Sequence, residues 1–196
     1  MKSSYLRAGA ALACALTLSA CGGSDGNMLL GGQFSGVTKT GLVLTNNGGS
    51  DLAVTPTGTG TGEFYFPGLL ESDDKYDVQV KSIPSNAEKC EPFYNTGRVV
   101  YDVLSVRIIC TLKKHELRGT VTGLTGANLV LINGSTRVPV PAGATTFSML
   151  KIDEDAPYGI TILTQPDNQT CTVANGTGTM GANDVTNVAV TCGPRT

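Results

Sequence analysis

The strongest constraint on the fold is an internal repeat, because one pattern of residues occurs twice along the chain. The first copy opens with Gly32-Gln33-Phe34-Ser35-Gly36-Val37, and the second opens 87 residues later (119 − 32) with Gly119-Thr120-Val121-Thr122-Gly123-Leu124. Further landmarks recur in the same order with small shifts in spacing, as expected for loop insertions and deletions on a shared framework. These matched residues are Leu42 and Leu129, Phe64 and Phe147, Tyr76 and Tyr158, Pro84 and Pro166, Cys90 and Cys171, and Cys110 and Cys192.

The length of the repeat predicts tandem domains. A period above 80 residues is too long for a solenoid repeat and fits a small β-sandwich domain. We therefore expect one domain at residues 31–112 and a second at residues 116–193. The polar segment Lys113-Lys114-His115-Glu116 is expected to bridge them.

Composition and patterning predict strands and no helices in both copies. Charged residues make up only 15% of the chain, and short apolar runs are broken by Gly, Asn and Pro. Residues 76–80 and 158–162 alternate apolar and polar side chains, which is the period of a half-buried strand. Six or seven short strands per copy predict an all-β fold of two antiparallel β-sandwiches. The sequence does not separate an immunoglobulin-like from a prealbumin-like arrangement.

The cysteines predict one disulfide in each copy. Four of the six lie in the repeats, and an even number in an exported chain favours disulfides. Because each copy should close on itself, we expect the pairs Cys90–Cys110 and Cys171–Cys192, with similar spacings. The alternative is a zinc site with four thiolates. Such sites use cysteines two to four residues apart, and this sequence has no such pair.

The first twenty residues have the pattern of a secretory signal. Two basic residues, Lys2 and Arg7, precede an apolar stretch that is too short to span a bilayer and ends in small residues. Leu18-Ser19-Ala20-Cys21-Gly22 resembles the lipobox of bacterial lipoproteins. That resemblance implies cleavage before Cys21, lipid on its sulfur and an acylated amine. Gly22, where inner-membrane lipoproteins of the enteric type often have Asp, favours the outer membrane. Residues 21–30 are then expected to form a lipidated tether.

The second copy carries a further resemblance. Residues 164–178, with Cys171 at their centre, and Asp184-Val185-Thr186-Asn187-Val188-Ala189-Val190-Thr191-Cys192 resemble a repeat that is common in secreted and lipid-anchored proteins of proteobacteria. The resemblance covers nearly all of the mature chain. It implies a fold and a location but no reaction. The first copy departs from it at residues 86–94.

Catalytic motifs are weak in this sequence. The single His, His115, falls in the predicted bridge, where we expect it to be solvated. Gly22-Gly23-Ser24-Asp25-Gly26 matches a nucleophile motif by letters only, because that motif needs a strand before it and a helix after it. Residues 58–62 are rich in Gly but lack the Lys of a phosphate loop. We therefore predict no catalytic residues, no cofactor and no metal site.

Two acidic loops and one aromatic pair remain as candidate binding residues. Glu71-Ser72-Asp73-Asp74 and Asp153-Glu154-Asp155 occupy matching positions and supply carboxylates of the kind that bind Ca²⁺. Neither follows an EF-hand or nonapeptide calcium pattern, so we expect solvated loops. Phe93 and Tyr94 belong to the segment peculiar to the first copy, and we expect them to be buried.

These observations predict a non-enzymatic, membrane-anchored module of the cell envelope that binds a protein or glycan partner or acts as a spacer. The alternatives are an accessory subunit of an envelope assembly and an enzyme with an unrecognised site. Removal of Lys2 and Arg7 with the signal changes the formal charge from −2 to −4 (−2 − 2). Because a nucleic-acid partner requires a basic surface, nucleic acid is not expected.

Overall fold

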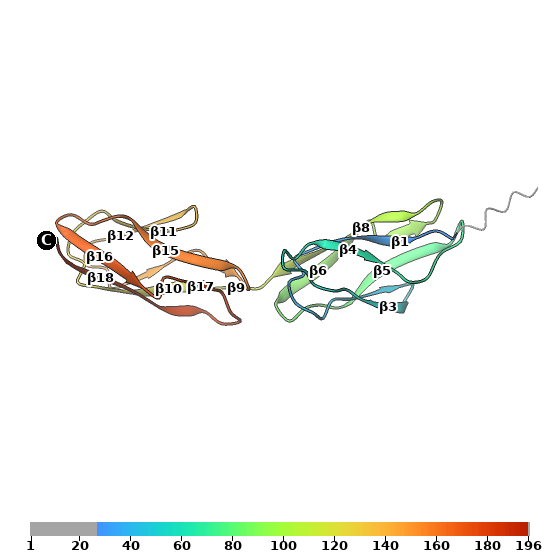
Figure 1. Ribbon diagram of the computed structural model, residues 1–196, viewed down its shortest axis with the longest axis horizontal. Coiled ribbons are helices and arrows are strands. Elements are labelled where there is room, and N and C mark those ends of the chain that lie inside the picture. The colour runs from blue at the N-terminus through green and yellow to red at the C-terminus, as the bar shows by residue number, and fades with distance from the viewer. Residues whose placement is uncertain (1–26, 196) are drawn as a thin grey trace, which may run out of the picture.

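The computed structural model describes residues 27–195, which form two β-sandwich domains lying end to end (Figure 1). The expected signal segment, residues 1–20, and the expected lipidation site, Cys21, lie outside the described residues. Within residues 27–195, no helix is long and apolar enough to cross a membrane. The prediction of an all-β fold with two tandem sandwiches is confirmed.

Each domain consists of two four-stranded sheets. In the first domain, one sheet has the order β4 (Gly62–Tyr65), β1 (Leu30–Ser35), β8 (Val103–Leu112), β6 (Ala87–Phe93). The facing sheet has the order β3 (Gly49–Ala53), β2 (Val43–Asn46), β5 (Lys75–Ser82), β7 (Thr96–Arg98).

The second domain repeats this order. One sheet contains β13 (Thr146–Ser148), β10 (Leu117–Thr122), β18 (Val185–Pro194) and β16 (Gln169–Ala174). The other contains β12 (Thr136–Val140), β11 (Leu129–Asn133), β15 (Pro157–Thr164) and β17 (Thr177–Thr179). A short additional pair, β9 (Lys114–His115) with β14 (Ile152–Asp153), lies at the end nearest the first domain.

The two domains have separate apolar cores. In the central strands, alternating side chains point between the sheets, and β10 shows strict alternation of buried and exposed positions. Leu30, Leu44 and Ile108 are fully buried in the first core, and Leu117, Leu131 and Met180 are fully buried in the second.

The strand order bears on the two arrangements that the sequence left open. In the immunoglobulin arrangement, the first two strands share a sheet. Here β1 and β2 lie in different sheets, and β1 pairs in parallel with the last strand of its domain, β8. Strands β10 and β18 pair in the same way. This order favours the prealbumin-like arrangement.

The repeated glycines explain why the parallel pairs pack closely. Gly32 lies opposite Val106, and Gly119 lies opposite Val188. A Cβ atom added to Gly119 would overlap the backbone oxygen of Val188, and one added to Gly32 would overlap that of Val106. Glycine at these two positions therefore lets the first and last strands of each domain approach one another.

Both predicted disulfides are present. Cys90–Cys110 joins directly opposed residues of β6 and β8, and Cys171–Cys192 joins those of β16 and β18. Each bond links the last strand of a domain to an antiparallel neighbour in the same sheet.

The start of the first domain differs from the expected boundary. Strand β1 begins at Leu30, and Met28 exchanges two backbone hydrogen bonds of 2.9 Å with Leu70. Residues 28–30 therefore belong to the first domain and not to the expected tether of residues 21–30, because their backbone groups are paired within the sandwich.

Candidate functional site: the polar junction between the domains

The segment between the domains is hydrogen-bonded to both of them. The Lys113 amide donates to the carbonyl oxygen of Asn86 in the first domain (2.9 Å), and the Lys113 carbonyl accepts from the Glu154 amide of the second (2.8 Å). His115 and Lys114 pair with Ile152 and Asp153 across β9 and β14. The backbone of the bridge is thus fixed on both sides.

Asn86 carries the side-chain contact between the domains. Asn86 is fully buried and lies at the end of the first domain, just before β6. The Nδ2 group donates to Thr38 Oγ1 of the same domain (2.7 Å) and to Asp155 Oδ2 of the second (2.8 Å). Thr38 Oγ1 donates to the same Asp155 oxygen (3.1 Å). A buried Nδ2 donor that bonds to a carboxylate of the neighbouring domain favours one relative position of the two domains, because separation would break that bond.

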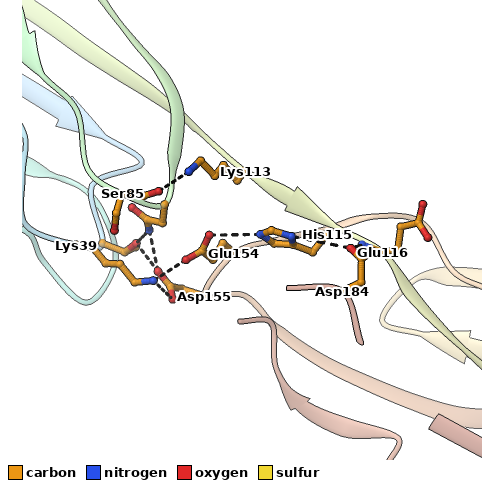
Figure 2. A network of polar contacts seen from close by, with 10 residues as sticks. Lys39, Ser85, Lys113, His115, Glu116, Glu154, Asp155 and Asp184 are labelled. Carbon is orange, nitrogen blue, oxygen red and sulfur yellow. Dashed lines mark hydrogen bonds and ion pairs between the residues drawn. The ribbon is translucent and has the colours of Figure 1, made fainter. Parts of the chain in front are cut away.

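Lys39 forms ion pairs with the acidic loop that follows β14 (Figure 2). Its Nζ lies 2.7 Å from Glu154 Oε1 and 3.2 Å from Asp155 Oδ1. Glu154 is only 3% exposed, whereas the side chain of Lys39 is 40% exposed. The first domain therefore supplies a cation that pairs with a buried carboxylate of the second domain.

These contacts change the pKa values of the three charged groups. The hydrogen bond from Lys39 lowers the pKa of Glu154 and outweighs the opposing effect of burial. Burial would raise the pKa of Asp155, but hydrogen bonds from Lys39, Thr38 and Asn86 lower it below its usual value. Hydrogen bonds to Glu154 and Asp155 raise the pKa of Lys39. All three shifts favour the charged forms that the junction requires.

His115 lies on the other side of the buried carboxylate. Its Nε2 is 3.4 Å from Glu154 Oε2, and its Nδ1 is 4.0 Å from Asp184 Oδ1 (Figure 2). The side chain is 16% exposed. Glu154 is thus held between Lys39 of the first domain and His115 of the bridge.

Two expectations from the sequence are therefore wrong. His115 is not a solvated linker residue, and the second acidic loop is not solvated, because both pack into the junction. The sequence does contain a signal for this contact, because the two copies differ at both residues of the ion pair between the domains. Glu154 corresponds to Ser72 in the first copy (154 − 82), and Lys39 corresponds to Gly126 in the second (39 + 87).

The other candidate residues lie apart from the junction. The first acidic loop, Glu71 to Asp74, is exposed at the opposite end of the first domain. Residues 58–62 form a turn that leads into β4. Among residues 27–195, no group of three or more His, Cys, Asp or Glu side chains is arranged to hold a metal ion. Gly22 to Gly26 lie outside the described residues.

The expected burial of Phe93 and Tyr94 is also wrong. Phe93 is 43% exposed and Tyr94 is 70% exposed. Tyr94 has φ 53°, a left-handed conformation that Asn175 adopts at the matching position of the second copy. Asn tolerates that conformation better than a bulky side chain does. The turn after β6 thus points the Tyr94 ring away from the core.

Comparison with known proteins identifies no family. Neither a protein-family model nor a curated protein sequence matches the chain. The similar solved structures include the Bacillus anthracis TIE protein, with 15% identity and a TM-score of 0.38 over 84% of this chain and 34% of that chain. Another consists of two B repeat units of the collagen binding protein of Staphylococcus aureus, with 16% identity and a TM-score of 0.29 over 85% of this chain and 48% of that chain.

A third similar structure is the shaft pilin from Lactobacillus rhamnosus GG, with 10% identity and a TM-score of 0.29 over 86% of this chain and 97% of that chain. The chain spans about a third of the length of the first of these proteins and about half of the second. The fold assignment rests on the sheets described above, and the comparisons assign no partner.

Proposed function

We propose that this chain is a lipid-anchored, non-catalytic module of the bacterial cell envelope that holds its second domain at a fixed distance and orientation from a membrane. The observation that carries the proposal is the polar junction. A bridge whose backbone is bonded to both domains, together with a shared buried amide and ion pairs, suits a rigid spacer. A chain whose domains needed to move independently would lack such contacts.

The anchor is inferred from the sequence. A basic start, a short apolar stretch and Leu18-Ser19-Ala20-Cys21 are the features on which lipid attachment to bacterial lipoproteins depends. Two or three acyl chains hold a protein firmly in a bilayer, whereas one does so only marginally. The outer membrane is the membrane that we propose, because Gly22 follows the Cys.

An accessory subunit of an envelope assembly is a second candidate. It is favoured by the exposed aromatic side chains of the first domain, of which Tyr94 is 70% exposed. Exposed aromatic residues are frequent anchors in protein interfaces. In that case the partner would be a protein or glycan at the flank of the first domain, and the second domain would remain a spacer.

Cys21→Ser is expected to abolish lipid attachment. Cells that express the wild-type chain and are fed an alkyne analogue of palmitate should give a labelled protein in the membrane fraction. The variant should give no label and should appear in the soluble fraction or as uncleaved precursor, since serine lacks the thiol that accepts the lipid. Cys14→Ser, within the apolar stretch, is the matched control and should be labelled normally. Equal labelling of Cys21→Ser and the wild type would contradict the anchor.

Asp155→Asn is expected to loosen the junction. Asn tolerates the left-handed φ of 69° at this position, but it lacks the charge that pairs with Lys39. Loss of a hydrogen bond to a charged group is expected to raise the population of molecules with an open junction about tenfold. Hydrogen exchange of the Lys113 and Glu154 amides measures that population, because Lys113 bonds to Asn86 of the first domain and Glu154 of the second domain bonds to Lys113.

The matched control is Asp73→Asn, which changes the corresponding residue of the first copy, where φ is 72° and the side chain is 85% exposed. Exchange of the Lys113 amide should be unchanged in this control. Unchanged protection of both junction amides in Asp155→Asn would contradict a rigid spacer.

Acidic pH should loosen the wild-type junction, and hydrogen exchange of the Lys113 and Glu154 amides should detect it. The pKa values of Glu154 and Asp155 are lowered from ordinary values of 4.5 and 3.8. Their contribution is therefore complete above the ordinary values and is lost as the pH falls through the lowered ones. Protection factors corrected for intrinsic exchange should be constant between about pH 5 and pH 8 and should fall towards about pH 3. Asp155→Asn should show a smaller change with pH than the wild type.

A further inference from the structure

The end of the first domain that is opposite the junction exposes a group of large apolar side chains. These residues, here called the apolar end surface, are Leu29 (37% exposed), Leu69 (51%), Val100 (68%) and Tyr101 (76%). The backbone brings them together. Leu29 bonds to Asp102 Oδ1 through its amide (2.9 Å) and to the Val103 amide through its carbonyl (2.8 Å). Leu70, next to Leu69, pairs with Met28.

The second copy shows what this end of a domain does when it has a neighbour. There the bridge and the acidic loop, through Lys113, Glu154 and Asp155, form the junction with the first domain. The β9–β14 pairing of His115 with Ile152 corresponds to the pairing of Met28 with Leu70. At the position of Leu69 the second copy has Lys151 (69 + 82), and in place of Val100-Tyr101 it has Gly181-Ala182-Asn183. The apolar side chains are therefore not required by the fold of the loops.

The chain that precedes this surface is short. Cys21 lies seven residues before Met28 (28 − 21), and seven extended residues span at most about 25 Å. If Cys21 carries lipid, as proposed above, the apolar end surface cannot lie further than that from the bilayer. It is also the end of the two-domain rod at which the described chain starts, because β1 begins there (Figure 1).

We propose that the apolar end surface docks on the phospholipid bilayer that holds the anchor, with Val100, Tyr101 and Leu69 inserted as far as the boundary between the headgroups and the acyl chains. This inference rests on the proposed lipid attachment of Cys21. Tyrosine is enriched at membrane interfaces because its ring is apolar and its hydroxyl group remains hydrated. Docking of the end surface would fix the orientation of the two domains relative to the membrane, which the lipid on Cys21 alone would not do.

The charges around the surface specify the kind of lipid. The exposed carboxylates of Glu71, Asp73 and Asp74 lie in the adjoining loop, which bonds to Val99 beside Val100. Arg98 and Lys75 provide fewer positive charges nearby. An excess of acid repels an anionic surface. The surface therefore fits zwitterionic headgroups, such as those of phosphatidylcholine or phosphatidylethanolamine.

The absence of Trp from the sequence allows a specific test. In Tyr101→Trp, the single indole reports only on position 101. The lipidated full-length variant would be reconstituted in phosphatidylcholine vesicles with brominated acyl chains, which quench an indole that reaches the acyl region. We expect its fluorescence to fall about twofold and to shift to shorter wavelength, as for an interfacial aromatic residue. Leu150→Trp, at a 68% exposed position of the second domain, should be unaffected.

A second pair of variants separates docking from mere proximity to the tether. Leu69→Lys and Val100→Gly, made in the Tyr101→Trp background, introduce the residues that the second copy has at those positions. Both should abolish the quenching while the protein still floats with the vesicles. Quenching that persists in both, or that is absent in Tyr101→Trp although the protein floats, would overturn the docking proposal and leave the anchor intact. A chain that carries no lipid and does not float would overturn the anchor and the docking proposal together.

Discussion

Replacing Gly119 by Ala is expected to destabilise the second domain by about 3 kcal/mol, because a Cβ at this position overlaps the backbone oxygen of Val188. The overlap involves backbone atoms of the facing strand, so a change of rotamer cannot relieve it. Strands β10 and β18 must move apart, and the core residues between the sheets lose contacts. For a domain of this size the loss corresponds to a fall in melting temperature of more than about 10 °C. Thermal unfolding followed by circular dichroism measures it.

Gly193→Ala is the matched control for this prediction. Gly193 lies in β18, and a Cβ at its position would have no atom within 4 Å. Its melting temperature should stay close to that of the wild type. If Gly119→Ala melted together with Gly193→Ala, the close approach of the first and last strands would not be essential to the domain.

The double variant Cys171→Ala, Cys192→Ala is expected to lose about 3 kcal/mol of stability, also in the second domain. The disulfide closes a loop with a sequence separation of 21, and the chain-entropy model assigns about that value to such a loop. Cys171 and Cys192 are 3% and 7% exposed, so the loss of two buried sulfur atoms adds to the effect. Urea unfolding should show a lower midpoint for the second domain.

The double variant Cys90→Ala, Cys110→Ala provides the comparison. It should lower the midpoint of the first domain and leave the second nearly unchanged, because the two cores are separate. Reductant should lower the midpoints of both domains in the wild type and of only one domain in each double variant. A double variant that unfolded like the oxidised wild type would contradict a stabilising role for that disulfide.

Local pattern in the sequence predicts most of the fold. The alternation at residues 158–162 predicts a strand because one face of it must be buried, and β15 spans Pro157 to Thr164. The repeat predicts the pairing of Cys171 with Cys192, since equivalent cysteines must occupy equivalent strands. These inferences succeed because they depend on neighbours within one domain.

The junction could not be predicted in the same way. Lys39 and Glu154 are 115 residues apart. The two copies differ at both positions, but that difference does not indicate which residue either one contacts. An acidic loop has the same composition whether it faces water or another domain. Only the structure shows that Glu154 is buried against Lys39 and His115. Tyr94 escaped prediction for a related reason, because its exposure follows from a left-handed turn that aromatic residues rarely adopt.

The parallel pairing of the first and last strands has a mechanical consequence for a chain that is pulled from its two ends. The chain enters the first domain at the start of β1 and leaves it at the end of β8, at opposite ends of the domain. Tension along the rod therefore slides β1 past β8, so that the hydrogen bonds of the ladder are loaded together and not one after another. If the domain did yield, the covalent link between Cys90 and Cys110 would keep the residues between them from extending. The length released under load would be correspondingly short.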